Sequence, residues 1–449
     1  MTQSVVDHLS DGHAAHVDLP RFEVRDLPAA MMNPGDAAWS LSGAVDATEG
    51  YPEPVRHDVN LDELQIDQDA AKVVKRLTRS GHEAYLVGGC VRDLLLGCSP
   101  KDFDVATSAL PEDVRRLFRN SRVIGRRFRL VHVLYAGGKV IETATFRRAP
   151  LPDDEGERSE LLIRSDNEFG RAHEDARRRD FTVNGLFYDI DSKQVLDWVG
   201  GMPDIARRTI NTIGDPVVRF QEDPIRILRA IKFAARLDCG MTPEVYDAIV
   251  QCRSALAMAA RPRLFEELLR LLRGGAAHRS LWLAWETGVL DVLLPELAAY
   301  LCDEGENGGN IWRAFSEIDR RTKARGEPLS DVVLCSVLML EPMLEACQFA
   351  RDRLHAAGRF LDPIVDRLNV PRRIAEAMRR IAAVLPRLQA GKGGRFQRSA
   401  LHAEAKTVVD IRAASLQGAS APQMAPAPPS ARPARRRRKR SAPSASVEV

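Results

Sequence analysis

The periodicity of apolar residues in this 449-residue chain changes once, near Asp215. Before that point, short apolar segments typical of strands alternate with helical segments, which indicates an α/β or α+β unit. After it, apolar residues recur at helical spacing almost throughout, from EDPIRILRAIKFAARL to RRIAEAMRRIAAVL. The sequence therefore predicts an α+β fold, in which a small mixed β-sheet with helices precedes an all-helical half.

Order is predicted to begin near Leu61, where LDELQIDQDAAKVVKRLTRSGH shows helical spacing and ends at a glycine. The pattern then predicts strands at AYLVGG, DFDVAT, RLVHVLY and KVIETATF, and helices at VRDLLLG and PEDVRRLFRN. The charged segment 152–175 is expected to be a loop. FTVNGLFYD followed by QVLDWVGG is expected to be a β-hairpin.

The two ends of the chain lack the apolar residues that a packed unit needs. Residues 1–60 mix Gly, Pro, Asp and Ala without periodicity, and residues 416–449 are mainly Pro, Ala, Ser and Arg. Both segments are predicted to be disordered, the second as a basic tail that contains the run Arg432 to Arg440. Two or more packed units are expected between them.

Cysteine usage and hydropathy indicate the cellular compartment in which the protein works. Seven cysteines lie between Cys90 and Cys347 without C-x-x-C spacing, so neither a disulfide framework nor a zinc site is indicated. The first twenty residues do not resemble a secretory signal, and no segment is apolar over a membrane-spanning length. We therefore expect a cytoplasmic protein without a membrane partner.

The segment YLVGGCVRDLLLGCSPKDFDVAT contains two acidic residues one position apart. Residues two apart in a strand point to the same face, so Asp102 and Asp104 are expected to present both carboxylates to one spot, with Phe103 packed behind them. A hard divalent cation relieves the repulsion between two such charges, and Mg²⁺ prefers few carboxylates together with phosphate oxygens and water. Alone, such a pair is more often two solvated carboxylates.

Two glycines just upstream strengthen the metal hypothesis. Gly88 and Gly89 stand between a predicted strand and a predicted helix, where backbone N–H groups can approach a polyphosphate. A tight turn without a ligand is the simpler alternative. Together with Lys101 beside the acidic pair, this arrangement favours a nucleotidyl-transfer centre with two Mg²⁺ ions.

These residues also carry a family resemblance. LVGGCVRDLLLGCSPKDFDVAT resembles the signature of the polymerase β superfamily, in the class II nucleotidyltransferase family that contains bacterial poly(A) polymerases and tRNA CCA-adding enzymes. Ordered motifs continue the likeness through much of residues 61–390. The resemblance implies that Asp102 and Asp104 are catalytic metal ligands, and it assigns four residues to the nucleotide site: Gly88, Gly89, Arg92 and Asp93.

A third catalytic acidic residue is implied by the same resemblance. Glu142, in VIETATFRR, alternates with apolar neighbours and is the candidate. The alternative is a strand residue paired with Arg147 or Arg148, and the pattern does not choose between the two interpretations.

EDARRRDFTVNGLFYD resembles the family's nucleotide-contacting element, in which Arg179, Asp180 and Asn184 would bind the incoming nucleotide. Asn184 is expected on a strand. Gly185 stands where the family pattern predicts Ala or Ser, and arginines in such a loop are otherwise merely solvated. Gly200, Gly201 and Asp204 resemble the hinge after the catalytic domain, with a simple hairpin exit as the alternative.

EDPIRILRAIKFAARL resembles the family's base-selecting helix. The resemblance implies that Asp223 and Arg226 meet the Watson–Crick edge of the base, with Arg229 on the same helix face as Arg226. The periodicity alone indicates a helix that begins near Glu222 and carries a Glu222–Arg226 pair. Both interpretations can hold together.

VIGRRFRLVHVLY, residues 123–135, resembles the polyadenylating branch of the family more than the CCA-adding branch. The resemblance implies that three arginines bind RNA phosphates: Arg126, Arg127 and Arg129. The alternative is that they are the solvated residues of a basic edge strand. The element NVPRR and the basic tail are typical of the same branch, and the tail offers a route to RNA-decay partners.

The resemblance implies five segments: a disordered arm over 1–60, a nucleotidyltransferase head over 61–215, a helical neck for base recognition over 216–275, an RNA-binding helical body over 276–415, and a disordered basic tail over 416–449. The expected function is template-independent addition of AMP from ATP to RNA 3′ ends, in RNA processing and decay. The nearest alternative is a tRNA CCA-adding enzyme. A non-catalytic RNA-binding scaffold is the alternative from another class.

Overall fold

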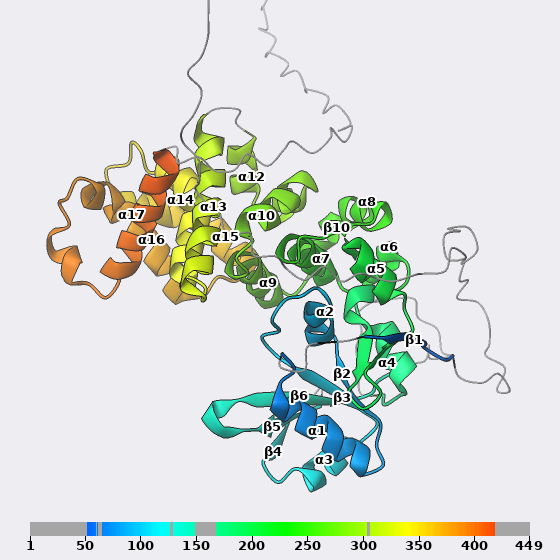
Figure 1. Cartoon of the computed structure of the whole chain (residues 1–449). Helices are drawn as coiled ribbons and strands as arrows, with labels where there is room; N and C mark the ends of the chain where they lie inside the picture. Colours follow the sequence, from blue (N-terminus) through cyan, green and yellow to red (C-terminus); the bar gives the residue numbers. More distant parts are fainter. Residues whose placement is uncertain are drawn as a thin grey trace, which may run out of the picture.

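The computed structural model describes residues 52–59, 61, 65–125, 129–148, 168–302 and 306–417 (Figure 1). Strands and helices alternate up to about residue 210, and helices make up nearly all that follows. The predicted α+β fold with a mixed sheet and a helical remainder is confirmed. Most of the arm 1–60, the tail after residue 417, most of the segment 152–175, and Arg126 and Arg127 lie outside the described residues.

The described part of the head is built on a mixed sheet of eight strands in the order β1-β8-β7-β2-β3-β6-β5-β4. The strands are β1 Val55–Asp58, β2 Ala84–Val87, β3 Asp104–Thr107, β4 Ser121–Ile124, β5 Leu130–Leu134, β6 Val140–Thr145, β7 Leu186–Asp189 and β8 Gln194–Asp197. Neighbouring strands are antiparallel except β3 and β6, which are parallel.

Helices cover both faces of this sheet because its central strands carry apolar residues on both sides. On one face pack α1 (Gln68–Arg79) and α3 (Pro111–Leu117), with Val73, Val74 and Leu77 of α1 buried. On the other face α4 (Ala172–Arg178) buries Ala172 and Ala176 against Phe146 and Phe187. α2 (Gly89–Leu95) follows β2 directly.

The second half of the described chain consists mainly of helices, and the later ones pack around one apolar helix. The bounds are α5 Gly201–Arg207, α6 Pro216–Glu222, α7 Ile225–Arg236, α8 Pro243–Cys252, α9 Arg261–Arg273, α10 Ala277–Glu286, α11 Val289–Leu293, α12 Pro295–Leu301, α13 Glu306–Arg325, α14 Asp331–Ala346, α15 Arg353–Leu368, α16 Arg372–Gln389 and α17 His402–Leu416. α14 is buried on nearly every side and contacts α13, α15, α16 and α17. In Figure 1, α7 and α9 lie between the head and the helices α13 to α17.

Several predicted element boundaries are wrong. Order does not begin at Leu61, since β1 pairs with β8 before it. Its four residues VRHD are mostly exposed, so β1 forms through its hydrogen-bonded ladder and shows no apolar pattern in the sequence. β4 was likewise not predicted. The segment 152–175 is not all loop, because α4 begins at Ala172, where the Glu174 side chain accepts the N–H of Arg171.

Three motif residues also sit on other elements than predicted. Asn184 lies in a 3₁₀ turn, Thr182–Asn184, rather than on a strand. Glu222 ends α6 instead of beginning α7, because Pro224 has no N–H group and cannot continue α6. β3 begins at Asp104, so Asp102 precedes the strand.

The turn at Gly200 is tied down by hydrogen bonds. The Asp197 carboxylate accepts the N–H groups of Val199, Gly200, Gly201 and Met202 at 2.8–3.1 Å. Asp204 is buried and accepts the hydroxyl of Thr182 at 2.7 Å. This geometry is that of a fixed turn and does not favour the hinge interpretation.

Within the described ranges, no helix has the length and hydropathy to cross a membrane.

Candidate active site

Acidic side chains gather where β3 and β6 lie side by side. Asp104, the first residue of β3, is paired in register with Glu142 of β6. Asp102 is exposed on the segment before β3, and Phe103 between the two aspartates is buried. Burial, followed by the charge of Glu142 and more weakly of Asp102, raises the pKa of Asp104 to about 6, although Arg179 opposes the shift. We call Asp102, Asp104 and Glu142 the acidic edge.

Glu142 has a histidine neighbour across the sheet. His132 on β5 is its register partner, and His132 Nε2 lies 3.5 Å from Glu142 Oε1. Arg148, one of the two arginines considered as a partner from the sequence, instead contacts Glu168 at 3.0 Å. The side chain of Glu142 is half exposed, so it remains accessible to a ligand.

The acidic edge fits a magnesium site in its chemistry. Among the residues that the structure describes, no three His, Cys, Asp or Glu side chains are gathered closely enough to hold a metal ion as they stand. Mg²⁺ usually takes one or two protein carboxylates and completes its shell with water and phosphate oxygens. The pKa of Asp104 is raised because burial, and then the charges of Glu142 and Asp102, destabilise its charged form, and a bound cation would offset that cost.

The glycine turn follows β2 and adjoins the acidic edge, because Val87 is the register partner of Asp104. Gly88 has φ = +74°, and a Cβ atom there would lie 2.7 Å from Arg179 Nη1. The positive φ requires glycine, and a Cβ atom would also displace the guanidinium of Arg179. Arg179 donates to Asp175 Oδ2 at 3.0 Å and to the backbone oxygen of Asn184 at 3.3 Å. A guanidinium is thus held against the turn that was predicted to bind phosphate.

Arg92 and Asp93 lie beneath this turn rather than on its surface, and each is 3 % exposed. Arg92 donates through Nε and Nη2 to Asp93 Oδ1, at 2.8 and 2.5 Å, and through Nη1 to Asn184 Oδ1 at 2.5 Å. Arg236 of α7 donates to Asp93 Oδ2 at 2.8 Å. In this arrangement both residues support the turn, and direct nucleotide contact by either stays a prediction.

Asp180 joins the head to α7. Its Oδ1 accepts Asn184 Nδ2 at 3.0 Å, and its Oδ2 accepts Arg229 Nε at 2.6 Å. Burial alone raises the pKa of this carboxyl, but the charge of Arg229 and these hydrogen bonds outweigh it and hold the pKa below the usual range. The predicted residues Asp180, Asn184 and Arg229 are therefore brought together.

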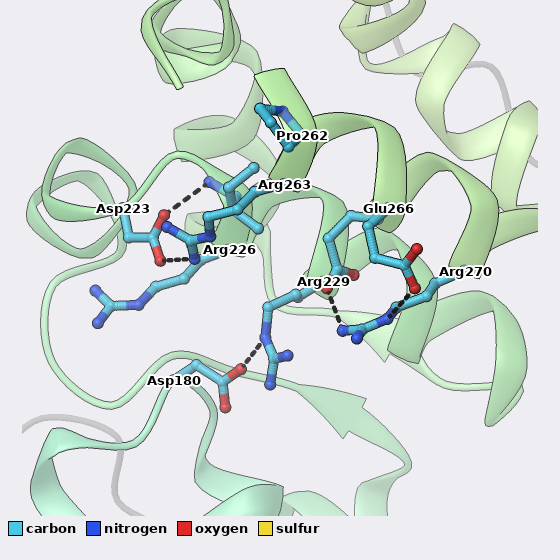
Figure 2. Close-up of a pocket in the computed structure, with 10 residues that line it drawn as sticks. Asp180, Asp223, Arg226, Arg229, Pro262, Arg263, Glu266 and Arg270 are labelled. Carbon is cyan, nitrogen blue, oxygen red and sulfur yellow. Dashed lines mark hydrogen bonds and ion pairs between the residues drawn. The ribbon is translucent and has the colours of Figure 1, made fainter. Parts of the chain in front are cut away.

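A cavity of about 460 Å³ lies between α7, α9 and Asp180, a volume within the range of small-ligand sites. Figure 2 shows Asp223 facing Arg263, Arg229 facing Asp180, and Arg270 beside Glu266. We call this cavity the neck pocket; its lining residues are Asp180, Asp223, Ile225, Arg226, Arg229, Pro262, Arg263, Glu266, Glu267 and Arg270.

The α9 wall of the neck pocket was not predicted from the sequence. Arg263 Nη2 donates to Asp223 Oδ2 at 2.8 Å, while Arg226 donates to Glu222 at 2.7 Å and to the Arg219 backbone oxygen at 2.9 Å. In the sequence, RPRLFEELLRLL looks like an ordinary amphipathic helix. Its polar residues lie about 40 positions from their partners, so no local spacing marks them.

One of the three predicted RNA-binding arginines lies in the described residues. Arg129 Nη1 contacts Glu112 Oε1 at 3.2 Å, and both side chains are largely exposed. Such a pair is weak and leaves the guanidinium free to exchange partners. Its contact with RNA stays a prediction.

The site combines the acidic edge, the glycine turn with Arg179 held against it, and the neck pocket between α7, α9 and Asp180. Together these features define a nucleotidyltransferase head joined to a helical neck. Comparison with known proteins agrees. Residues 84–211 match the family described as the Poly A polymerase head domain, and residues 240–301 match the one described as a probable RNA and SrmB-binding site of polymerase A.

Individual relatives support the same assignment. Poly(A) polymerase I of Salmonella typhimurium is 37 % identical over 368 residues, which cover 77 % of each chain. The CCA-adding enzyme of Geobacillus stearothermophilus is 39 % identical over 232 residues, 51 % of this chain and 55 % of that enzyme. The crystal structure of the Bacillus stearothermophilus CCA-adding enzyme in complex with CTP has a TM-score of 0.56 and 29 % identity, and covers 79 % of this chain and 78 % of its own.

The chain belongs to the family of bacterial poly(A) polymerases, within the class II nucleotidyltransferases that also include tRNA CCA-adding enzymes. It is an enzyme of the polynucleotide adenylyltransferase type.

Proposed function

We propose that this enzyme adds AMP from ATP to RNA 3′ ends without a template, with Mg²⁺, and thereby marks RNA for processing and decay. The observation that carries the proposal is the extent of the likeness. Poly(A) polymerase I matches 77 % of the chain, including much of the helical half, whereas the CCA-adding relative matches 51 %.

The acidic edge is the proposed metal site, with Asp102 and Asp104 as ligands and Glu142 as the third carboxylate. When bound, Mg²⁺ supplies positive charge that neutralises the triphosphate and favours ionisation of the RNA 3′-hydroxyl. The backbone of the glycine turn and the guanidinium of Arg179 face the phosphates in this proposal. Catalysis is then mainly positioning and charge neutralisation.

The neck pocket is the proposed base site. Asp223 offers acceptors and Arg226 offers donors, the groups needed to read the edge of a base.

The proposed reaction forms one bond and breaks one. The O3′–Pα bond forms, and the bond from Pα to the oxygen that bridges the α- and β-phosphates breaks. Pyrophosphate leaves with the electron pair, and the hydroxyl proton passes to solvent.

Nucleotide use decides between the two branches of the family. The purified chain is incubated with labelled ATP or CTP and either an unstructured oligoribonucleotide or a tRNA that lacks its CCA end. Long A tracts on the oligoribonucleotide support the proposal. Addition of CTP and then ATP to the tRNA, followed by a stop, supports the second candidate, CCA addition, which the 39 % identity over 51 % of the chain favours.

The acidic edge is tested by replacing Asp102 and Asp104 together with alanine. We expect AMP incorporation to be lost while binding of an oligoribonucleotide is nearly unchanged, because carboxylates make no attractive contact with RNA phosphates that alanine would remove. Asp113→Ala is the matched control, since this carboxylate of α3 pairs only locally with Arg116 at 2.6 Å. Normal incorporation by the double variant would contradict the catalytic assignment of Asp102 and Asp104.

A further inference from the structure

Two arginines of α7 hold this helix on the head. Arg229 and Arg236 are seven residues apart and so share one helix face. Arg229 pairs with Asp180 at 2.6 Å, and Arg236 pairs with Asp93 at 2.8 Å. The second pair reaches α2, the helix that begins at the glycine turn. Arg236 lies near the end of EDPIRILRAIKFAARL, but the sequence assigned no role to it.

Arg236 shares a single buried carboxylate with Arg92. Asp93 Oδ1 accepts two N–H groups of Arg92, and Asp93 Oδ2 accepts Arg236 Nη2. The guanidinium of Arg92 also packs over the ring of Phe233, one turn before Arg236 on α7, at 4.8 Å. Helix α7 therefore determines where Arg92 lies, through one ion pair and one aromatic ring.

Polar contacts continue from Arg92 to the glycine turn. Arg92 Nη1 donates to Asn184 Oδ1 at 2.5 Å. The backbone oxygen of Asn184 accepts Arg179 Nη1 at 3.3 Å, and the same Nη1 lies 2.7 Å from the position that a Cβ atom on Gly88 would take. An unbroken series of contacts thus joins the neck to the guanidinium beside the proposed phosphate site.

We propose that Arg236 is a positioning residue of the nucleotide site. By holding the second oxygen of Asp93 it fixes Arg92 and, through Asn184, keeps Arg179 against the glycine turn. The inference rests on the proposed function, since it assigns a role at that site. The Arg236 side chain is 32 % exposed, and without it the buried Asp93 still keeps the guanidinium of Arg92 as a partner, so removal of Arg236 affects nucleotide binding more than thermal stability.

The test compares Arg236→Ala, Arg236→Lys and the wild-type chain by calorimetric titration with ATP and Mg²⁺. Arg236→Ala is expected to weaken ATP binding about tenfold, which is the size of effect that loss of one buried charge-assisted hydrogen bond has. In steady-state kinetics it should raise KM for ATP more than it lowers kcat. Arg236→Lys keeps a cationic donor for Asp93 and recovers most of the affinity. Arg367→Ala is the control, because it breaks a two-pronged pair with Glu296 at 2.7 and 2.9 Å between α15 and α12.

Melting temperatures of all variants separate folding from binding. ATP affinity of Arg236→Ala equal to that of Arg367→Ala overturns the proposal, and so does a lysine variant no better than the alanine variant. If Arg236→Ala does not fold, Arg236→Gln replaces it, with several-fold weaker ATP binding expected and unchanged binding overturning the idea.

Binding and incorporation are read separately. ATP binding that depends on Arg236 in a chain that adds no AMP removes the proposed function and leaves this inference standing. AMP addition that does not depend on Arg236 does the reverse. A wild-type chain that binds no ATP overturns both.

Discussion

At the scale of single residues, Asp104 is the group whose environment says most about the chemistry. It is largely buried, it faces Glu142 across a parallel pair of strands, and its pKa is raised to about 6. A protein stabilised only by its packing would gain nothing from such a cluster of like charges, because each raises the cost of ionising the other. The cluster is explained if a cation neutralises it.

The pKa of Asp104 sets a pH dependence for the proposed metal binding. Below about pH 6 the carboxyl keeps its proton, and Mg²⁺ has to displace that proton to bind. We expect the affinity for Mg²⁺ to fall about tenfold per pH unit below 6 and to be constant above 7. Calorimetric titrations at several pH values measure this, with Asp104→Asn as the variant that lacks the dependence. Equal affinities on both sides of pH 6 would contradict the assignment.

The same shift affects stability in the opposite sense. Without metal, the folded chain binds this proton more tightly than the unfolded chain, whose pKa is near the ordinary 3.8. The contribution of Asp104 to the free energy of unfolding is therefore largest at low pH and is lost as pH rises from 3.8 to about 6.

The residues predicted from the sequence and those found only in the structure differ in one respect. Gly88, Gly89, Asp102 and Asp104 lie within one segment of 17 residues, where turn and strand periodicity are enough to relate them. Arg236 meets Asp93 across 143 positions, and no local pattern marks that pair.

At the scale of elements, the contact between α7 and α9 forms one wall of the neck pocket. Lys232 Nζ donates to Glu267 Oε2 at 2.9 Å; Glu267 is buried, and the Lys232 side chain is 13 % exposed. Burial lowers the pKa of Lys232 to about 8, although Glu267 opposes the shift. Glu267 also accepts Arg270 Nη1 of its own helix at 2.7 Å. Its bond to Lys232 is the one that joins α9 to α7.

Removing one partner of this pair should cost more than removing both. Glu267→Ala leaves a buried ammonium without its counter-charge, and we expect it to lower the free energy of unfolding by about 3 kcal/mol. Lys232→Met combined with Glu267→Met removes both charges and should regain most of that loss. Urea unfolding of the three chains measures the difference. A double variant as unstable as Glu267→Ala would show that packing rather than charge is responsible.

The edge strand β1 gives a second prediction at this scale. Deleting residues 2–60 removes β1 with its hydrogen bond from Gln194 to Asp58 at 2.9 Å, and also the bond from Trp198 to the oxygen of Pro52, which precedes the strand, at 3.0 Å. We expect this deletion to lower the free energy of unfolding by about 1–2 kcal/mol relative to deletion of residues 2–51, which keeps the strand. Thermal unfolding compares the two. Identical midpoints would mean that β1 adds nothing to the head.

At the scale of the whole molecule, head, neck and body follow one another in space as they do in the chain (Figure 1). The apolar α14 is packed among its neighbours. One of these neighbours, α16, buries its apolar face and has an exposed basic face on the other side. Arg373, Arg380 and Arg387 are exposed and recur every seven residues, so they form one row with steps of about 10 Å.

This row predicts how the body takes part in RNA binding. Replacing the three arginines with alanine should weaken binding of any oligoribonucleotide to a similar degree, because phosphates carry no sequence information. The slope of log affinity against log salt should become shallower by up to about 2. Fluorescence anisotropy over a range of salt concentrations tests this, with Arg320→Ala of α13, which pairs locally with Glu317, as control. ATP affinity should not change.

Local sequence was sufficient for the α+β order of elements, the glycine turn and the acidic pair, because helices, strands and turns depend on residues a few positions apart. Folding was needed to place β1 on the sheet edge, to add α9 to the neck pocket and to bring Arg236 to Asp93, since these contacts join residues 40 to 143 positions apart. Their energy comes from ladder hydrogen bonds and from charge pairing across elements, and neither leaves a periodic pattern in the sequence.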